Sequence, residues 1–123
     1  MGGRILIVDD EVYIRRILAF KLECAGYSTF EAPSAEAAES VLEANDVDLM
    51  LLDVGLATST NGFDLAARLR QNARTERLPI ILLTARGYAS DVLRGREVGA
   101  AGYITKPFST EDVIDRVLAI LGS

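Results

Sequence analysis

Apolar and polar residues follow two different periods along this chain. Between its predicted strands, and after the last of them, apolar residues recur every three or four positions, which predicts helices. The helices are expected to start at Val12 and after Ser34, to span 63–73 and 89–98, and to follow Ser109. The strands are expected at 4–8, 47–52 and 79–83, where short runs are dominated by apolar residues, and at the weaker, partly polar run 27–32 and the run 101–105.

The same period predicts which helix faces are buried. The first helix is expected to bury Ile14, Ile17, Leu18, Leu22 and Ala25. The last helix is expected to bury Val113, Ile114, Val117, Leu118 and Leu121. Cys24 falls among apolar residues of the first helix, so we expect a buried, unreactive thiol there. Gly95 is expected to weaken the fourth helix, because glycine costs roughly 1 kcal/mol relative to alanine inside a helix.

Alternation of strands and helices is typical of βαβ units, which give a parallel sheet with helices on both faces. Five such units are too few to close a barrel of eight strands. The sequence therefore predicts an α/β fold with an open, doubly wound, five-stranded parallel sheet, and one domain over residues 1–123. The runs 4–8, 47–52 and 79–83 are the most apolar and should be central, whereas 27–32 should be an edge strand.

Composition narrows the possible functions. The 13 basic and 18 acidic residues give a net charge of −5, which disfavours non-specific binding to nucleic acid. Histidine is absent, and Cys24 is the single cysteine, so His or Cys metal clusters and internal disulfides are excluded. No apolar run reaches the ~18 residues of a membrane span, and no signal peptide is evident. We expect a cytoplasmic protein that meets other proteins or cations.

Polar residues directly follow four of the predicted strands, namely Asp9, Asp10, Asp53, Thr84 and Lys106. The carboxyl ends of parallel strands share one edge of a sheet, so these side chains are expected to converge, with Glu31 outside the group. Carboxylates without His or Cys suit Mg²⁺, which prefers oxygen ligands. Lys106 can pair with a phosphoryl oxygen, Thr84 can donate a hydrogen bond, and Asp53 can act as a nucleophile towards phosphorus.

Each of these residues also has an ordinary interpretation. Asp53 could merely start a turn, Asp9 and Asp10 could be solvated charges at the start of a helix, and Lys106 could be a surface charge.

Because bonds before proline can adopt the cis form, we expect a cis peptide bond between Lys106 and Pro107.

The sequence resembles the receiver domain of two-component response regulators. The matching stretches follow the order and approximate spacing of that family, and they lie at 5–11, 48–53, 82–85 and 99–108. The resemblance implies a flavodoxin-like fold with strand order 2-1-3-4-5. It also implies that Asp53 is the phosphoacceptor, and that Asp9, Asp10, Asp53 and the main-chain carbonyl of Gly55 hold Mg²⁺.

The resemblance further implies a switch in which Thr84 and Lys106 reorganise around the phosphoryl group and Tyr103 moves inward. The phosphoryl donor would be a histidine kinase or a histidine phosphotransfer protein, docking near the first helix and Pro107-Phe108. The domain would assist its own phosphorylation and dephosphorylation without being a turnover enzyme. Its output would be a downstream partner or a fused domain, with no direct contact to nucleic acid or membrane.

The sequence departs from the family in the loop after Asp53. Gly55 and Ala57 stand where receivers commonly carry a bulky residue and a proline, and Gly62 comes about one residue late. Together with Arg86, the small Gly55 is expected to alter the walls around the phosphoryl group and the access of water. The sequence Ala101-Gly102 replaces an acidic pair common in receivers that dimerise, so we expect a monomer or a weak dimer.

Three other classes of protein share parts of this pattern. A flavodoxin-like nucleotide binder would need a phosphate loop rich in small residues after the first strand, where this chain has acids. A phosphohydrolase of the haloacid dehalogenase type would need an Asp-x-Asp motif on the first strand. A receiver-like adaptor that functions without phosphorylation would not need the full set of site residues.

Overall fold

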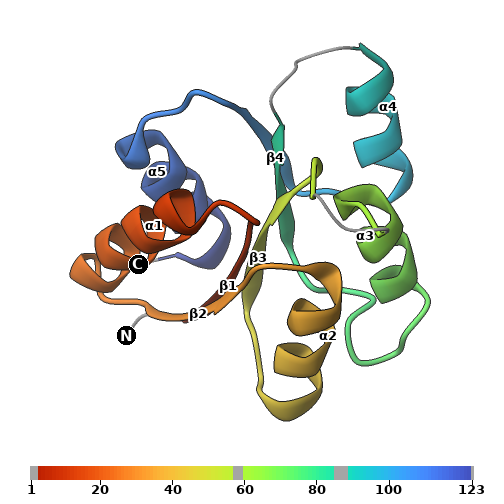
Figure 1. The fold of residues 1–123 in the computed structure, drawn as a ribbon, viewed down its shortest axis with the longest axis horizontal. Coiled ribbons are helices and arrows are strands. Elements are labelled where there is room, and N and C mark those ends of the chain that lie inside the picture. Colours follow the sequence, from red (N-terminus) through yellow and green to blue (C-terminus); the bar gives the residue numbers. More distant parts are fainter. Residues whose placement is uncertain (1–2, 57–59, 85–88, 123) are drawn as a thin grey trace.

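A five-stranded parallel sheet forms the centre of the computed structural model, which describes residues 3–56, 60–84 and 89–122 (Figure 1). The sheet order is β2-β1-β3-β4-β5, which confirms the predicted doubly wound topology. The strands are β1 (Arg4–Val8), β2 (Ser28–Ala32), β3 (Leu49–Asp53), β4 (Ile80–Thr84) and β5 (Gly102–Thr105).

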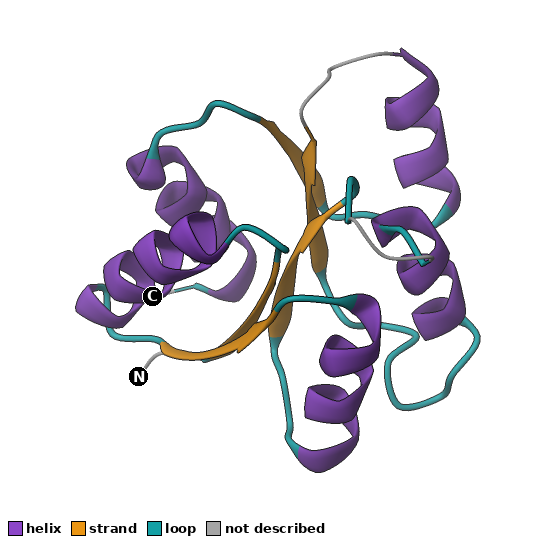
Figure 2. Cartoon of the chain, viewed as in Figure 1, coloured by secondary structure: helices purple, strands orange, loops and turns teal. Residues whose placement is uncertain are grey.

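Helices cover both faces of this sheet (Figure 2). One face carries α1 and α5, and the other carries α2, α3 and α4. The helices are α1 (Val12–Cys24), α2 (Ala35–Ala44), α3 (Gly62–Arg70), α4 (Ala89–Glu97) and α5 (Thr110–Leu121). None of the helices in the described part of the chain is long and apolar enough to cross a membrane.

Every residue of β3 and β4 is buried, because each strand is covered by helices on both faces. Alternate side chains enter different cores. Met50 and Leu52 pack on the side of α2 and α3, whereas Leu49 and Leu51 pack on the side of α1 and α5. The edge strand β2 is more exposed, as predicted.

Polar side chains cap three of the helices. Ser34 Oγ accepts from the Ala37 amide at 3.1 Å, and Ser109 Oγ accepts from the Asp112 amide at 3.1 Å. At the third cap, Asn61 Oδ1 accepts from the amide of Asp64 at 2.9 Å, and α3 begins at Gly62. Each cap stabilises its helix by about 1 kcal/mol.

The buried face of α1 is narrower than the sequence predicted. Leu18 and Leu22 are buried, but Ile17 is 49% exposed and Cys24 is exposed, so the prediction of a buried thiol was wrong. Ala25, also predicted to be inward, is exposed at the end of the helix. On α5, Leu118 is likewise 37% exposed. These residues lie at the margins of the apolar stripes, where spacing alone does not show how far a helix sinks into its neighbours.

Several element boundaries differ by one to three residues from those predicted. The strand β4 starts after Pro79, which has no N–H to donate, and it includes Thr84. The strand β3 starts at Leu49, since the Asp48 carboxylate accepts from the Arg4 amide at 2.8 Å and marks the turn into the strand. The helix α3 ends at Arg70, three residues before the predicted end.

The side chain of Arg70 fixes the end of α4. Its guanidinium donates to the main-chain oxygens of Val98 at 2.7 Å and Gly99 at 3.2 Å. It also donates to those of Thr75 and Glu76, both at 3.2 Å. Burial lowers the pKa of Arg70 from its ordinary value. The carboxyl end of α4 is thereby tied to α3 and to the segment that leads into β4.

Candidate functional site

The carboxyl ends of the central strands bring Asp9, Asp53 and Lys106 together. Asp9 follows β1 and is fully buried, Asp53 is the last residue of β3 and is 5% exposed, and Lys106 follows β5. Lys106 Nζ lies 2.9 Å from Asp9 Oδ2 and 3.3 Å from Asp53 Oδ2. Since β1, β3 and β5 are far apart along the chain, this cluster depends on the parallel order of the sheet.

Asp10 completes a cluster of three acids at this edge. It is exposed, and one carboxylate oxygen from each of Asp9, Asp10 and Asp53 can be chosen so that all lie within 4.8 Å of one another. An all-oxygen set of this kind fits Mg²⁺, which keeps several waters and needs only one or two carboxylates. The residues present therefore suit this cation. The main chain of Gly55 lies beside them, where its amide donates to Asp53 Oδ1 at 3.0 Å.

The charge state of the cluster is set by burial and by Lys106. Burial raises the pKa of Asp53, the nearby charge of Asp9 adds to the increase, and the Gly55 amide and Lys106 oppose it. Burial works against the ammonium of Lys106, but the two carboxylates outweigh it and raise the pKa of Lys106. The lysine is therefore charged at neutral pH, and the pocket holds more negative charge than one ammonium can offset. A divalent cation would relieve that excess.

Thr84 and Tyr103 lie on the other face of the sheet from this acid–lysine cluster. Tyr103 pairs with Leu82 in the β4–β5 ladder, and Thr84 is two residues further along β4. Because side chains alternate along a strand, both side chains project towards the face that carries α4. A phosphoryl group on Asp53, at the top of the sheet, would meet Lys106 from one face and Thr84 from the other.

Gly95 makes room for Tyr103 within α4. A Cβ atom on Gly95 would stand 2.6 Å from Tyr103 Oη and closer still to its ring. The sequence indicated only that this glycine weakens the helix. The structure provides a reason for it, since the half-buried tyrosine ring occupies the space that any larger residue would need.

Gly62 has a comparable role next to the main chain of Asp53. A Cβ atom there would stand 2.7 Å from Val54 Cα, 3.0 Å from the carbonyl carbon of Asp53 and closer to its oxygen. The Gly62 amide also donates to the Val54 oxygen at 3.2 Å. The start of α3 is therefore packed directly against the main chain that carries Asp53.

The departures in the loop after Asp53 are described only in part. Gly55 is exposed, and a Cβ atom there would have its nearest contact 3.6 Å away, at Asp53 Oδ1. Ala57 lies outside the described residues, as do Ala85, Arg86 and Gly87 in the loop after Thr84. The expected influence of Arg86 on the phosphoryl pocket stays a prediction.

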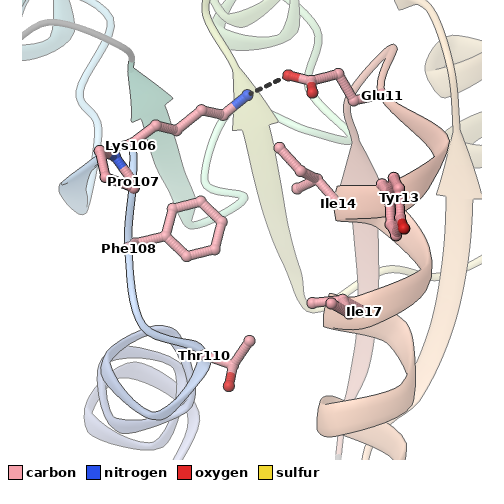
Figure 3. A pocket seen from close by; sticks show the side chains of 8 residues that line it. All are labelled: Glu11, Tyr13, Ile14, Ile17, Lys106, Pro107, Phe108 and Thr110. Atoms are coloured by element: carbon pink, nitrogen blue, oxygen red, sulfur yellow. Dashed lines mark ion pairs between the residues drawn. The ribbon is translucent and has the colours of Figure 1, made fainter.

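An apolar groove of about 560 Å³ opens next to the site, between α1 and the segment after β5 (Figure 3). Ile14 and Ile17 line one side and Phe108 lines the other. At its upper end, Lys106 Nζ lies 3.7 Å from Glu11 Oε1. The peptide bond between Lys106 and Pro107 is cis. The groove therefore leads from an apolar surface directly to the acid–lysine cluster.

Two contributors to the site were missed from sequence. Glu11 places a third carboxylate near Lys106, in addition to those of Asp9 and Asp53. The run Asp9-Asp10-Glu11 in the sequence could have indicated this. Arg15 reaches from α1 to the main-chain oxygen of Asp9 at 2.8 Å. No sequence pattern singles out Arg15, which stands beside a second arginine on the same helix.

The family model for the response regulator receiver domain matches residues 5–118, and the chain belongs to this family. Its fold is shared with solved receivers. A putative response regulator from Chloroflexus aurantiacus is 36% identical, with a TM-score of 0.91 over the whole of both chains. The chemotaxis protein CheY4 of Vibrio cholerae is 26% identical, with a TM-score of 0.92 over 98% of this chain and 100% of that one.

Among curated proteins, the phosphate regulon transcriptional regulatory protein PhoB of Pseudomonas aeruginosa is 45% identical over 121 residues. That match covers 98% of this chain and 52% of PhoB. The chain thus spans about half the length of the curated relatives that it matches.

Proposed function

We propose that this domain is a phosphorylation-controlled switch in which Asp53 accepts a phosphoryl group from a phosphohistidine. The donor is a histidine kinase or a histidine phosphotransfer protein. One observation carries the proposal: Asp53 Oδ2 lies 3.3 Å from Lys106 Nζ within a cluster of three acids that suits a divalent cation. Membership of the receiver family supports the same role.

In the proposed reaction, a carboxylate oxygen of Asp53 attacks phosphorus, and the phosphorus–nitrogen bond of phosphohistidine breaks. The electron pair leaves with the donor imidazole, which takes up a proton. Asp9, Asp10, Asp53 and the Gly55 carbonyl would hold Mg²⁺, which supplies positive charge beside the phosphoryl oxygens. Lys106, now shared between two carboxylates, is placed to pair with one phosphoryl oxygen.

The new phosphoryl group adds nearly two negative charges next to Thr84. Thr84 would donate to a phosphoryl oxygen, and Tyr103 would follow it inward along the same face of the sheet. Because Tyr103 packs against Gly95, this movement would alter the surface formed by α4 and β5. We propose that the two arrangements coexist and that phosphorylation shifts their populations.

The groove beside Lys106 is the proposed docking site for a helix of the phosphodonor. Its walls are apolar, and α1 continues outward with Tyr13 at 80% and Phe20 at 63% exposure. Large exposed apolar patches are typical of sites that bind other proteins. A helix seated between α1 and Phe108 would bring its phosphohistidine to Asp53.

The remaining parts of the proposal follow from the family. The domain would catalyse its own phosphorylation and dephosphorylation without turning over a separate substrate, and it would act in the cytoplasm as a monomer or weak dimer. Its output would be a partner protein or a fused domain. Because the curated relatives are named transcriptional regulators, control of transcription is the proposed result, with no nucleic acid bound by this part of the chain.

The phosphoacceptor is tested with acetyl phosphate and Mg²⁺, followed by mass spectrometry of the intact chain and its peptides. We expect one added phosphoryl group on Asp53, no labelling in Asp53→Asn, and no labelling when EDTA removes the cation. Asp46→Asn, which alters an exposed acid at the other end of β3, serves as the matched control. Unlabelled parent protein, or labelled Asp53→Asn, would overturn the proposal. Sustained hydrolysis of a phosphomonoester would support the phosphohydrolase class instead.

The docking surface is tested separately with a purified histidine kinase that phosphorylates the parent chain. Ile17→Ser should slow phosphotransfer from the kinase while labelling by acetyl phosphate is retained. Leu118→Ser changes an apolar residue of similar exposure on α5 and should transfer at the rate of the parent. Equal transfer rates in the two variants would place the donor elsewhere.

A further inference from the structure

Arg15 lies beneath the loop that carries the two acids after β1. Its Nη1 donates to the main-chain oxygen of Asp9 at 2.8 Å, and its Nε donates to Glu31 Oε1 at 3.3 Å. The Arg15 side chain is only 14% exposed and that of Glu31 is 34% exposed. Glu31 pairs with Ile7 in the β1–β2 ladder, so its side chain projects to the face of the sheet that α1 covers.

The hydrogen bond from Arg15 fixes a particular peptide group. The oxygen it binds belongs to the peptide that joins Asp9 to Asp10. The Asp9 side chain is already held by the Glu11 amide at 2.9 Å and by Lys106 at 2.9 Å. Asp10 differs, because within the described ranges no hydrogen bond or ion pair holds its carboxylate. The direction of the Asp10 side chain therefore depends on the peptide that Arg15 holds.

The charge of Arg15 would by itself oppose a cation at this site. A guanidinium bonded to Asp9 repels a divalent ion among the three acids, and Glu31 offsets only part of that charge. An arginine in this place therefore favours cation binding only if it improves the geometry of the ligands. Groups outside the ligand set can have that effect, and their loss typically weakens metal binding by about 10–100-fold.

We infer that Arg15 and Glu31 form a positioning pair that orients the Asp9–Asp10 peptide for the divalent cation. The inference rests on the proposed function, since it assigns a new role around the same Mg²⁺ site. Removing the positive charge of Arg15 should therefore weaken the binding of a cation, which is the opposite of what charge repulsion alone predicts.

The test measures Mg²⁺ affinity by isothermal titration calorimetry at constant ionic strength, with thermal melts to confirm that each variant is folded. Arg15→Ala should bind Mg²⁺ at least about 10-fold more weakly than the parent. Arg15→Lys, which keeps the charge but lacks the planar guanidinium whose Nε and Nη1 bond Glu31 and Asp9, should lie between them. Arg16→Ala is the matched control, because it removes the same charge from an exposed position on α1.

Glu31→Ala provides a second measurement that leaves the arginine in place. It should also weaken Mg²⁺ binding, and the double variant with Arg15→Ala should lose no more than the worse single variant, because the two residues act as a unit. Affinity that rises in Arg15→Ala would show an effect of charge alone and overturn the inference. Unchanged affinity in both single variants would do the same. A parent chain that binds no Mg²⁺ would overturn the proposed function together with this inference.

Discussion

Substituting Gly62 by alanine tests whether the start of α3 holds Asp53, the proposed phosphoacceptor, in place. Gly62 is buried, and its N–H bonds the main-chain oxygen of Val54. The new methyl group would point at the main chain of Asp53 and Val54, which cannot rotate away as a side chain can. Relief requires that α3 or the end of β3 moves.

The size of that movement follows from the contacts. The added Cβ would stand 2.7 Å from Val54 Cα, against 3.4 Å for ordinary contact, so the main chain must shift by about 0.7 Å or more. Forced shifts of this kind in packed regions typically cost about 1–3 kcal/mol. Displacing a reacting group by about 1 Å can lower a rate by about 10²-fold. We expect losses of both sizes in Gly62→Ala.

Two assays measure these losses. Urea unfolding gives the free energy of unfolding, and the initial rate of labelling by acetyl phosphate and Mg²⁺ reports on Asp53. Gly102→Ala is the matched control, since a Cβ atom there would have its nearest contact at 3.6 Å, with the flexible Arg116 side chain. It should be as stable as the parent or slightly more stable, because alanine restricts the unfolded chain.

Equal stability and equal labelling rates in Gly62→Ala and Gly102→Ala would refute this role of Gly62. A loss of stability with an unchanged labelling rate would show that α3 adjusts while Asp53 stays in place, and would refute the part that concerns the phosphoacceptor.

Three further perturbations test the charges and contacts around the site. Since the folded state raises the pKa of Asp53, the contribution of Asp53 to stability in EDTA should be lost as the pH rises from 3.8 through the raised pKa, and Asp53→Asn should be more stable than the parent at pH 7 in urea unfolding. Since the folded state also raises the pKa of Lys106, its stabilisation is present below pH 10.5 and lost above it, and Lys106→Met should lose about 2 kcal/mol at pH 7. Gly95→Ala should destabilise the parent, but in a Tyr103→Ala background it should stabilise by up to ~1 kcal/mol, measured by thermal melts.

Each of these expectations has a clear contrary result. Equal stability of Asp53→Asn and the parent across pH would show that burial does not penalise the carboxylate. A Lys106→Met variant that keeps the parent's loss of stability above pH 10.5 would assign that loss to other groups. A Gly95→Ala effect of the same sign in both backgrounds would mean that the glycine does not serve the tyrosine.

The order and type of the elements were predictable from the sequence. Apolar residues recur every three or four positions in the helices and form unbroken runs in β3 and β4, and these periods depend only on local geometry. The convergence of Asp9, Asp53 and Lys106 was also foreseen, because parallel strands place their carboxyl ends at one edge. Boundaries shifted by one to three residues, and Cys24 was placed on the wrong side of α1.

The pattern along the chain therefore predicted the fold class and the residues that gather at one edge, whereas the sheet order followed from the resemblance to receivers. The contacts among these residues depend on the tertiary structure. Lys106 bonds the carboxylate of Asp9, which is 97 positions away in the sequence. Arg15 donates a hydrogen bond to the main-chain oxygen of Asp9, and the lack of a side chain at Gly95 leaves room for Tyr103. Periodicity shows which side chains are buried. The contacts among them also depend on how deeply each helix packs against the sheet and on where two main chains are too close for an added methyl group.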